Sequence, residues 1–176
     1  EQRRAAKAVN FGIIYGISDF SLSRDINVPV KKAAKYIEDY LNHYSGVKEY
    51  MQKIVRSAME NGYVSTIYGR RRYIPELSSP KFQIREFGKR VALNAPIQGS
   101  AADIIKIAMI RVYKQLKEQN LKSRLILQVH DELVIETHKQ EIGQVKEILQ
   151  QSMEKGFDLS VPLDIEISVQ DSLLKG

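Results

Sequence analysis

Four side chains near the start of the sequence recur at a spacing that suits binding of a charged, ring-containing ligand. They are Arg3, Lys7, Phe11 and Tyr15. Four residues advance an α-helix by about 400°, so these side chains fall on one slanting face of a helix. Along that face two cations precede two aromatic rings, which is the order of phosphates, sugar and base in a nucleoside triphosphate. We interpret this stripe as a candidate nucleotide-binding face.

Each residue type in the stripe has chemistry that fits this interpretation. Arg binds phosphate oxygens through paired hydrogen bonds, whereas Lys is a compact, mobile charge and a proton donor. A Phe ring can press on a sugar and a Tyr ring can stack on a base. The alternative is an amphipathic helix with both rings in the core. Gly12 and Gly16 favour the ligand, or a hinge, because a mid-helix Gly costs about 1 kcal/mol relative to Ala.

The sequence His130-Asp131-Glu132 is the second candidate site, because it interrupts an apolar segment from Leu125 to Ile135. We expect two strands to meet there at a tight turn that presents the carboxylates. Mg²⁺ prefers one or two carboxylates together with substrate phosphates, and two-metal phosphoryl transfer uses such ligands. The alternative is a solvated turn, in which Asp is common.

A two-metal site needs a second carboxylate, because Asp131 alone cannot hold both ions. No other aspartate of the chain has an equally specific setting. The candidates are Asp19, Asp25, Asp39, Asp103, Asp158, Asp164 and Asp171.

The composition favours a folded chain with a polyanionic partner. Of the 176 residues 43% are hydrophobic, the formal net charge is +6 and the pI is about 9.4. Phosphate neutralisation supplies most non-specific affinity for nucleic acids. The absence of cysteine excludes disulfides, thiol nucleophiles and Cys-ligated zinc. The sequence contains no apolar run of the roughly 20 residues that cross a bilayer, so we expect no membrane partner.

Helices are predicted to come first along the chain and an antiparallel sheet later, which indicates an α+β fold. Pro96 is expected to end one helix, and Gln98-Gly99-Ser100 to cap the next. The predicted helices span 3–15, 18–26, 29–43, 47–61, 80–95, 98–119 and 140–154. The predicted strands span 63–68, 72–74, 125–129, 133–136 and 163–169.

Taken together, these segments resemble DNA polymerase family A, the group of the bacterial DNA polymerases I. Residues 3–16 look like the family's fingers-helix motif B, and residues 129–132 like its palm motif C. The segments 68–73 and 94–103 also match, in the right order. The resemblance covers essentially all 176 residues.

The resemblance implies that the sequence is a fragment of a longer enzyme. The chain does not begin with Met, and the family's motif A, with its first catalytic aspartate, is expected upstream of Arg3. Residues 1–78 would form the mostly helical fingers subdomain. Residues 79–176 would form the C-terminal part of the palm subdomain, with its antiparallel sheet.

The resemblance also implies roles for the two candidate sites. Arg3 and Lys7 would bind the phosphates of the incoming nucleotide, and Lys7 would protonate the pyrophosphate leaving group. Phe11 would lie against the deoxyribose, in the form that disfavours dideoxynucleotides. Tyr15 would occupy the templating-base position before the fingers close. Asp131 would bind metal and act in catalysis with Glu132 beside it.

Four further residues are implied to contact the primer terminus and the minor groove of the new base pair. Minor-groove acceptors are nearly the same for all base pairs, so such contacts test the shape of a pair without reading sequence. These residues are Arg90, Asn94, Gln98 and His130. Residues 70–72, three consecutive arginines, are interpreted as a solvated basic hairpin that can touch the DNA backbone.

The implied function is template-directed addition of deoxynucleotides to a primer. The partners would be primer–template DNA, a deoxynucleoside triphosphate and the missing N-terminal part of the same enzyme, and the cofactors would be two Mg²⁺ ions. The enzyme would be a monomer in the bacterial cytoplasm, associated with the nucleoid. Two alternatives stay open. The fragment alone would be an inactive nucleotide- or duplex-binding module, or the parent would be a single-subunit RNA polymerase. Glu132 and the sequence Tyr68-Gly-Arg-Arg-Arg72 favour the DNA enzyme.

Overall fold

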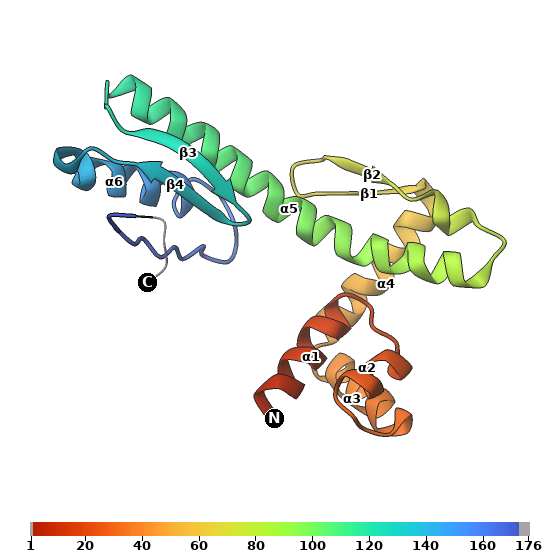
Figure 1. Cartoon of the computed structure of the whole chain (residues 1–176). Helices are drawn as coiled ribbons and strands as arrows, with labels where there is room; N and C mark the ends of the chain where they lie inside the picture. The colour runs from red at the N-terminus through yellow and green to blue at the C-terminus, as the bar shows by residue number, and fades with distance from the viewer. Residues whose placement is uncertain (1, 173–176) are drawn as a thin grey trace. The chain divides into compact units, whose positions relative to one another are not determined.

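The computed structural model describes residues 2–172, which divide into two compact units at residues 100 and 101 (Figure 1). Helices dominate, and two small antiparallel sheets lie between them along the chain, which confirms the α+β prediction. Each unit is defined by residues that contact one another more than they contact the other unit. The functional division into fingers over 1–78 and palm over 79–176 stays a prediction.

The first unit begins with four helices close to their predicted positions. Ser18 caps α2 by accepting a hydrogen bond from the backbone N–H of Ser21, and Pro29 precedes the first residue of α3. The buried side chains Leu22 and Ala33 lie on α2 and α3, which pack against each other. The four helices are α1 (Gln2–Ile14), α2 (Asp19–Asp25), α3 (Val30–His43) and α4 (Ser45–Asn61).

The end of α1 explains both glycines that the sequence singled out. Gly16 has a φ of +74°, its N–H donates to the carbonyl of Ile13, and the N–H of Ile17 donates to the carbonyl of Gly12. This is a Schellman motif, in which the left-handed residue is usually glycine. A Cβ on Gly12 would lie 3.0 Å from Cγ2 of Ile17. Both glycines therefore serve the helix terminus, which accounts for them without a ligand or a hinge.

A short hairpin follows α4 and packs on the next helix. The register of β1 (Tyr63–Ser65) and β2 (Arg71–Tyr73) pairs Val64 with Arg72. The prediction of a strand over 63–68 was too long, because Thr66 accepts backbone hydrogen bonds from Tyr68 and Arg70 and so begins a turn. After the 3-10 helix η1 (Pro75–Ser78), the core of the unit is completed by Ala58, Val64, Ile74, Leu77 and Ala92.

The helix α5 (Phe82–Glu118) is continuous, so the predicted break at Pro96 was wrong. A proline removes a single helical hydrogen bond, because it lacks one N–H. Ala92 and Ala95, on the N-terminal side of Pro96, pack in the core cluster of the hairpin, and Ser100 Oγ donates to the carbonyl of Pro96 at 2.6 Å. Gln98-Gly99-Ser100 therefore lies inside a helix and caps nothing.

The second unit is a two-stranded sheet with helices packed on it. Strands β3 (Arg124–Val129) and β4 (Glu132–Glu136) pair antiparallel, with a register shift between Leu125 and Leu127. The 3-10 helix η2 (Lys139–Glu141) and α6 (Ile142–Met153) follow. The core joins α5 to α6 through Val112, Leu116, Val145 and Ile148.

The predicted strand over 163–169 does not form within the part of the chain that the structure describes. Half-buried and exposed residues still alternate from Leu163 to Ser168, as in a strand with one covered face. A strand also needs a hydrogen-bonded neighbour, and the segment pairs with neither β3 nor β4. The alternation predicted which side chains share a face, and it could not predict a partner.

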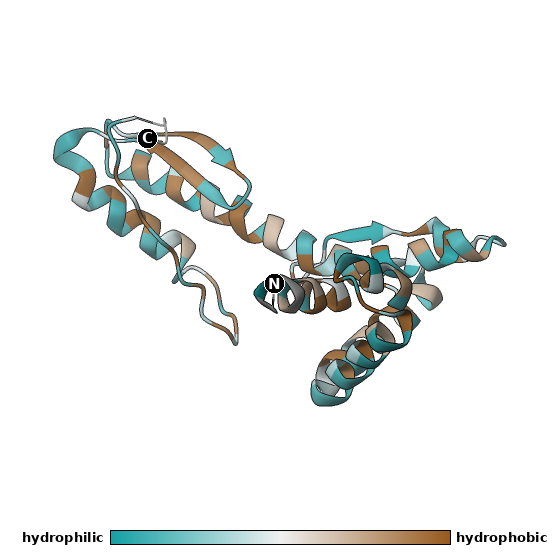
Figure 2. Ribbon diagram, turned by 60° about the horizontal axis from the view of Figure 1, so that its bottom comes forward, coloured by the Kyte–Doolittle hydropathy of each residue, from teal (hydrophilic) through white to brown (hydrophobic). Residues whose placement is uncertain are grey.

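None of the helices in residues 2–172 combines the length and apolar character needed to span a membrane. Apolar residues instead alternate with polar ones along the helices, and β2 is strongly hydrophilic (Figure 2).

Candidate functional site

The predicted stripe on α1 is present as a row of exposed side chains, three of which lie close to one another. The ring centroids of Phe11 and Tyr15 are 6.3 Å apart, and Lys7 Nζ lies 5.9 Å from the Phe11 centroid. Arg3 and Lys7 are exposed, and Phe11 and Tyr15 retain 51% and 36% of their accessible surface. The alternative of a helix with both rings in the core is therefore wrong. The buried side of the helix carries Ile13 instead.

A second stripe lies on α5 and contains three of the predicted DNA contacts. Arg90, Asn94 and Gln98 follow one another at four-residue spacing, so they share one slanting helix face. Arg90 and Gln98 are exposed, whereas Oδ1 of Asn94 is buried without a hydrogen-bond partner among the described residues. A buried acceptor without a partner is costly, so Oδ1 of Asn94 is an unsatisfied group of this helix, and it is not part of the surface that a ligand would contact directly.

The two stripes meet at a small hollow of about 410 Å³ between α1, α2 and α5. Tyr15 contributes from the end of α1 and Arg90 from α5. Sequence reasoning named both of these residues separately and did not predict that they share a cavity. It missed Ile17, Ser18 and Ser21, which line the cavity together with Gly12.

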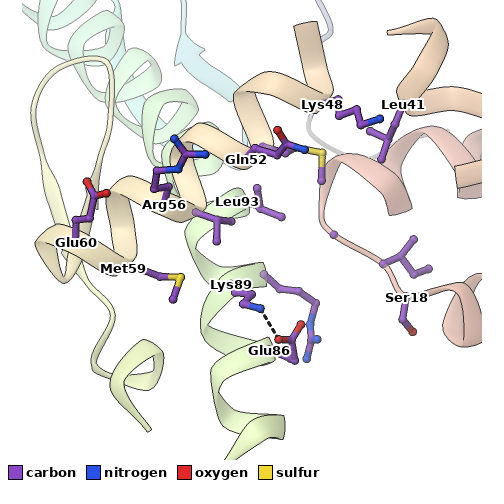
Figure 3. A pocket seen from close by; sticks show the side chains of 15 residues that line it. Ser18, Leu41, Lys48, Gln52, Arg56, Met59, Glu60, Glu86, Lys89 and Leu93 are labelled. Atoms are coloured by element: carbon purple, nitrogen blue, oxygen red, sulfur yellow. Dashed lines mark hydrogen bonds and ion pairs between the residues drawn. The ribbon is translucent and has the colours of Figure 1, made fainter. Parts of the chain in front are cut away.

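A larger hollow of about 1040 Å³ adjoins the first and shares Ile17, Ser18 and Arg90 with it. One wall is a row on α4 and another is α5, where Lys89 Nζ and Glu86 Oε1 form an ion pair at 2.6 Å (Figure 3). Sequence reasoning missed the α4 row, although its four-residue spacing was visible. The row consists of Lys48, Gln52, Arg56 and Glu60.

The acidic turn of the second unit has the predicted form. His130 adopts a left-handed φ of +52°, and its carbonyl accepts a hydrogen bond of 2.6 Å from Nε2 of Gln128. This conformation lets β3 turn tightly into β4. His130, Asp131 and Glu132 are all exposed. Two adjacent solvent-accessible carboxylates are thus presented at the tip of a hairpin.

The donor set at this turn fits a hard divalent cation only in part. Carboxylate oxygens are suitable ligands for Mg²⁺, and Asp131 and Glu132 are accessible to it. No group of three or more His, Asp or Glu side chains within residues 2–172 is arranged to hold a metal. The remaining ligands would have to come from substrate phosphates, water or further protein groups.

The carboxylate with a perturbed pKa lies near the start of β3. Glu141 accepts hydrogen bonds from Ser123 Oγ at 2.6 Å and from the N–H groups of Lys122 and Ser123. The bond from the Ser123 side chain, followed by that from the Lys122 backbone, lowers the pKa of Glu141. In the other unit, burial raises the pKa of Tyr50. Glu141 holds the loop that leads into the strand carrying the acidic turn.

Comparison with known proteins decides the family. The family model "DNA polymerase family A" matches residues 1–175. The chain belongs to DNA polymerase family A. DNA polymerase I of Caldicellulosiruptor bescii is 53% identical over 167 residues, and that of Bacillus subtilis is 52% identical over 166. These matches cover 95% and 94% of this chain.

A solved polymerase structure is similar in fold to this chain. It is the polymerase domain of Pol1 from M. smegmatis in complex with a DNA primer–template and dNTP, with a TM-score of 0.88 and 44% sequence identity. The match covers 92% of this chain and 29% of that one. The chain also spans only 20% and 19% of the two bacterial relatives, so it corresponds to a part of a family A polymerase.

Proposed function

We propose that the full-length protein carrying this chain is a template-directed DNA polymerase, which transfers deoxynucleotides to the 3′ end of a primer. The observation that carries the proposal is the exposed row of Arg3, Lys7, Phe11 and Tyr15 in a chain of this family. Its cations suit a triphosphate, and its rings suit a sugar and a base.

In this mechanism Arg3 and Lys7 bind the phosphates of the incoming nucleotide. The charge-assisted hydrogen bonds are strongest where negative charge develops on the leaving pyrophosphate. Lys7 carries protons on Nζ, so it can also donate one to the leaving group. Phe11 lies against the deoxyribose, and the ring of Tyr15 occupies the templating position until the template base displaces it.

Two Mg²⁺ ions are proposed as cofactors, with Asp131 as a ligand and Glu132 beside it. When bound, the ions supply charge that stabilises both the attacking and the leaving oxygen. The exposed position of both carboxylates supports this assignment. In the same complex, His130, Arg90, Asn94 and Gln98 contact the primer terminus and the minor groove.

The 176-residue chain alone is proposed to bind nucleotide or duplex weakly and to catalyse nothing. A single identified metal ligand is not enough to organise two ions. Primer extension by the purified chain would overturn this part of the proposal. The monomeric state and the association with the bacterial nucleoid stay predictions.

Primer extension by the full-length protein tests the proposed function and separates it from that of an RNA polymerase. The protein is given a primer–template, Mg²⁺ and each deoxy- or ribonucleoside triphosphate in turn. We expect extension by the deoxynucleotide complementary to the template base. A preference for ribonucleotides would favour the RNA enzyme, and incorporation without regard to the template would contradict the proposal.

A further inference from the structure

The larger hollow, of about 1040 Å³, is formed within the first unit, and the proposed function assigns it no role. Helices α3, α4 and α5 and the segment that follows α1 all contribute side chains to its lining. Its volume is at the upper end of the range for small-molecule sites, about 300–1,000 Å³, and such sites are mostly apolar with a few polar groups. The size of the hollow therefore suits a small organic ligand.

The apolar wall of the hollow is rich in methionine. Met51, Val55 and Met59 follow one another on α4 at four-residue spacing, and Leu41 and Leu93 face the same space. Two of the four methionines of the chain are thus on this wall, and Met59 points from α4 toward α5 (Figure 3). Methionine sulfur makes favourable contacts with aromatic rings, and its unbranched side chain adapts to their shape. The wall therefore suits the rings of an aromatic ligand.

The rim of the hollow carries an excess of positive charge. The charges of Glu86 and Lys89 offset each other in their ion pair of 2.6 Å. The other charged lining residues are one acid, Glu60, and three exposed cations that form no ion pair with a carboxylate of residues 2–172. These cations are Lys48, Arg56 and Arg90. The rim is thus complementary in charge to an anionic group.

We propose that this hollow binds an aromatic organic anion. The rings of the ligand lie on the methionine wall, and its carboxylate or sulfonate group pairs with the cations of the rim, of which a guanidinium can bind two oxygens at once. Gly16 and Ile17 also line the hollow, so the ligand contacts the residues that directly follow Tyr15. The proposal does not depend on the proposed function, because it concerns binding of the ligand alone.

The alternative is that another part of the full-length protein covers the apolar wall. In that case no small molecule could reach Met59, and a substitution there would not change the binding of a soluble aromatic anion. The two possibilities therefore differ in a binding measurement on the full-length protein.

Fluorescence titration of the full-length protein with 1-anilinonaphthalene-8-sulfonate, an aromatic anion whose emission rises when it leaves water, tests the proposal. We expect a saturable class of site with a Kd of about 10 to 100 μM. Met59→Glu should weaken this binding at least about fivefold, because it replaces an apolar contact with a like charge. Val161→Glu is the matched control, since it places the same charge at an exposed apolar residue outside the hollow.

The charge of the ligand is tested separately. Lys48→Gln with Arg56→Gln should weaken binding of the sulfonate about 2- to 5-fold, because exposed cations contribute modestly to an ion pair. N-phenyl-1-naphthylamine has the same rings without the sulfonate, so it should bind this double variant as tightly as it binds wild type. Equal midpoints of urea unfolding check that each variant is folded.

A Kd of folded Met59→Glu for the sulfonate within about twofold of that of wild type would overturn the proposal. A loss of affinity in Val161→Glu as large as that in Met59→Glu would do the same, because the probe would then not be bound in the hollow. If the double glutamine variant bound the sulfonate as tightly as wild type does, the assignment of an anionic ligand would be wrong.

Discussion

At the scale of single residues, Lys7 has the clearest chemical assignment. It lies between Arg3 and Phe11 on the exposed face of α1, with Nζ 5.9 Å from the Phe11 ring centroid. In that position the ammonium group of Lys7 can bind a phosphate while its aliphatic chain stays next to the Phe11 ring, which would contact the sugar.

We predict that Lys7→Ala lowers kcat/KM for the incoming nucleotide by about 10- to 150-fold in the full-length protein. A hydrogen bond to a charged group contributes about 1.5–3 kcal/mol, which corresponds to that range. Lys7→Arg should recover part of the loss, since it keeps the charge. Single-nucleotide extension over a nucleotide titration measures both. Lys35→Ala is the control, and equal kinetics for wild type and Lys7→Ala would refute the assignment.

At the scale of elements, the loop that leads into β3 depends on one carboxylate. Glu141 of η2 binds Lys122 and Ser123, and Ser123 Oγ in turn accepts from the N–H of His138 at 3.0 Å. These bonds join the start of β3 to the segment after β4, and so close the sheet at the end opposite the acidic turn.

The free energy of unfolding of this unit should therefore depend on pH through Glu141. Its pKa in the folded chain is below the ordinary value of 4.5, so the stabilisation is present above pH 4.5 and is lost as the pH falls through the folded pKa. We predict that Glu141→Gln destabilises the 176-residue chain at pH 7 and that the difference from wild type shrinks towards pH 3. Urea unfolding across this range measures it, with Glu147→Gln as control. If the difference in free energy of unfolding between wild type and Glu141→Gln stayed constant with pH, the ionised Glu141 carboxylate would not be the source of the stabilisation.

The elements also show what local sequence determines. The Schellman end of α1 and the acidic turn are local, so glycine and turn residues predicted both boundaries. The continuity of α5 through Pro96 depends on packing against a hairpin some 30 residues earlier, which local signals cannot report. The prediction of a strand over 163–169 was wrong for the same reason, because a strand needs a hydrogen-bonded partner and local sequence does not report one.

At the scale of the whole molecule, each of the two units carries one of the candidate sites. The stripe on α1 and the stripe on α5 belong to residues 1–100, and the acidic turn belongs to residues 101–176. Four-residue spacing predicted the first stripe from sequence, and the turn residues predicted the hairpin that carries Asp131. The hollow shared by Tyr15 and Arg90 came only from the structure, because it depends on how α1 ends against α5.

We propose that residues of both units act in one nucleotidyl transfer, with metal held at Asp131. The most direct test is single-turnover extension of a primer by the full-length Asp131→Ala variant. The control is Asp158→Ala, which removes an exposed carboxylate elsewhere. Without the Asp131 carboxylate, metal charge would be lost at the reacting oxygens, so the extension rate of Asp131→Ala should be at least about 100-fold below that of wild type. Its affinity for the primer–template and the extension rate of Asp158→Ala should equal those of wild type. Extension by Asp131→Ala at a rate within a few-fold of wild type would contradict the account.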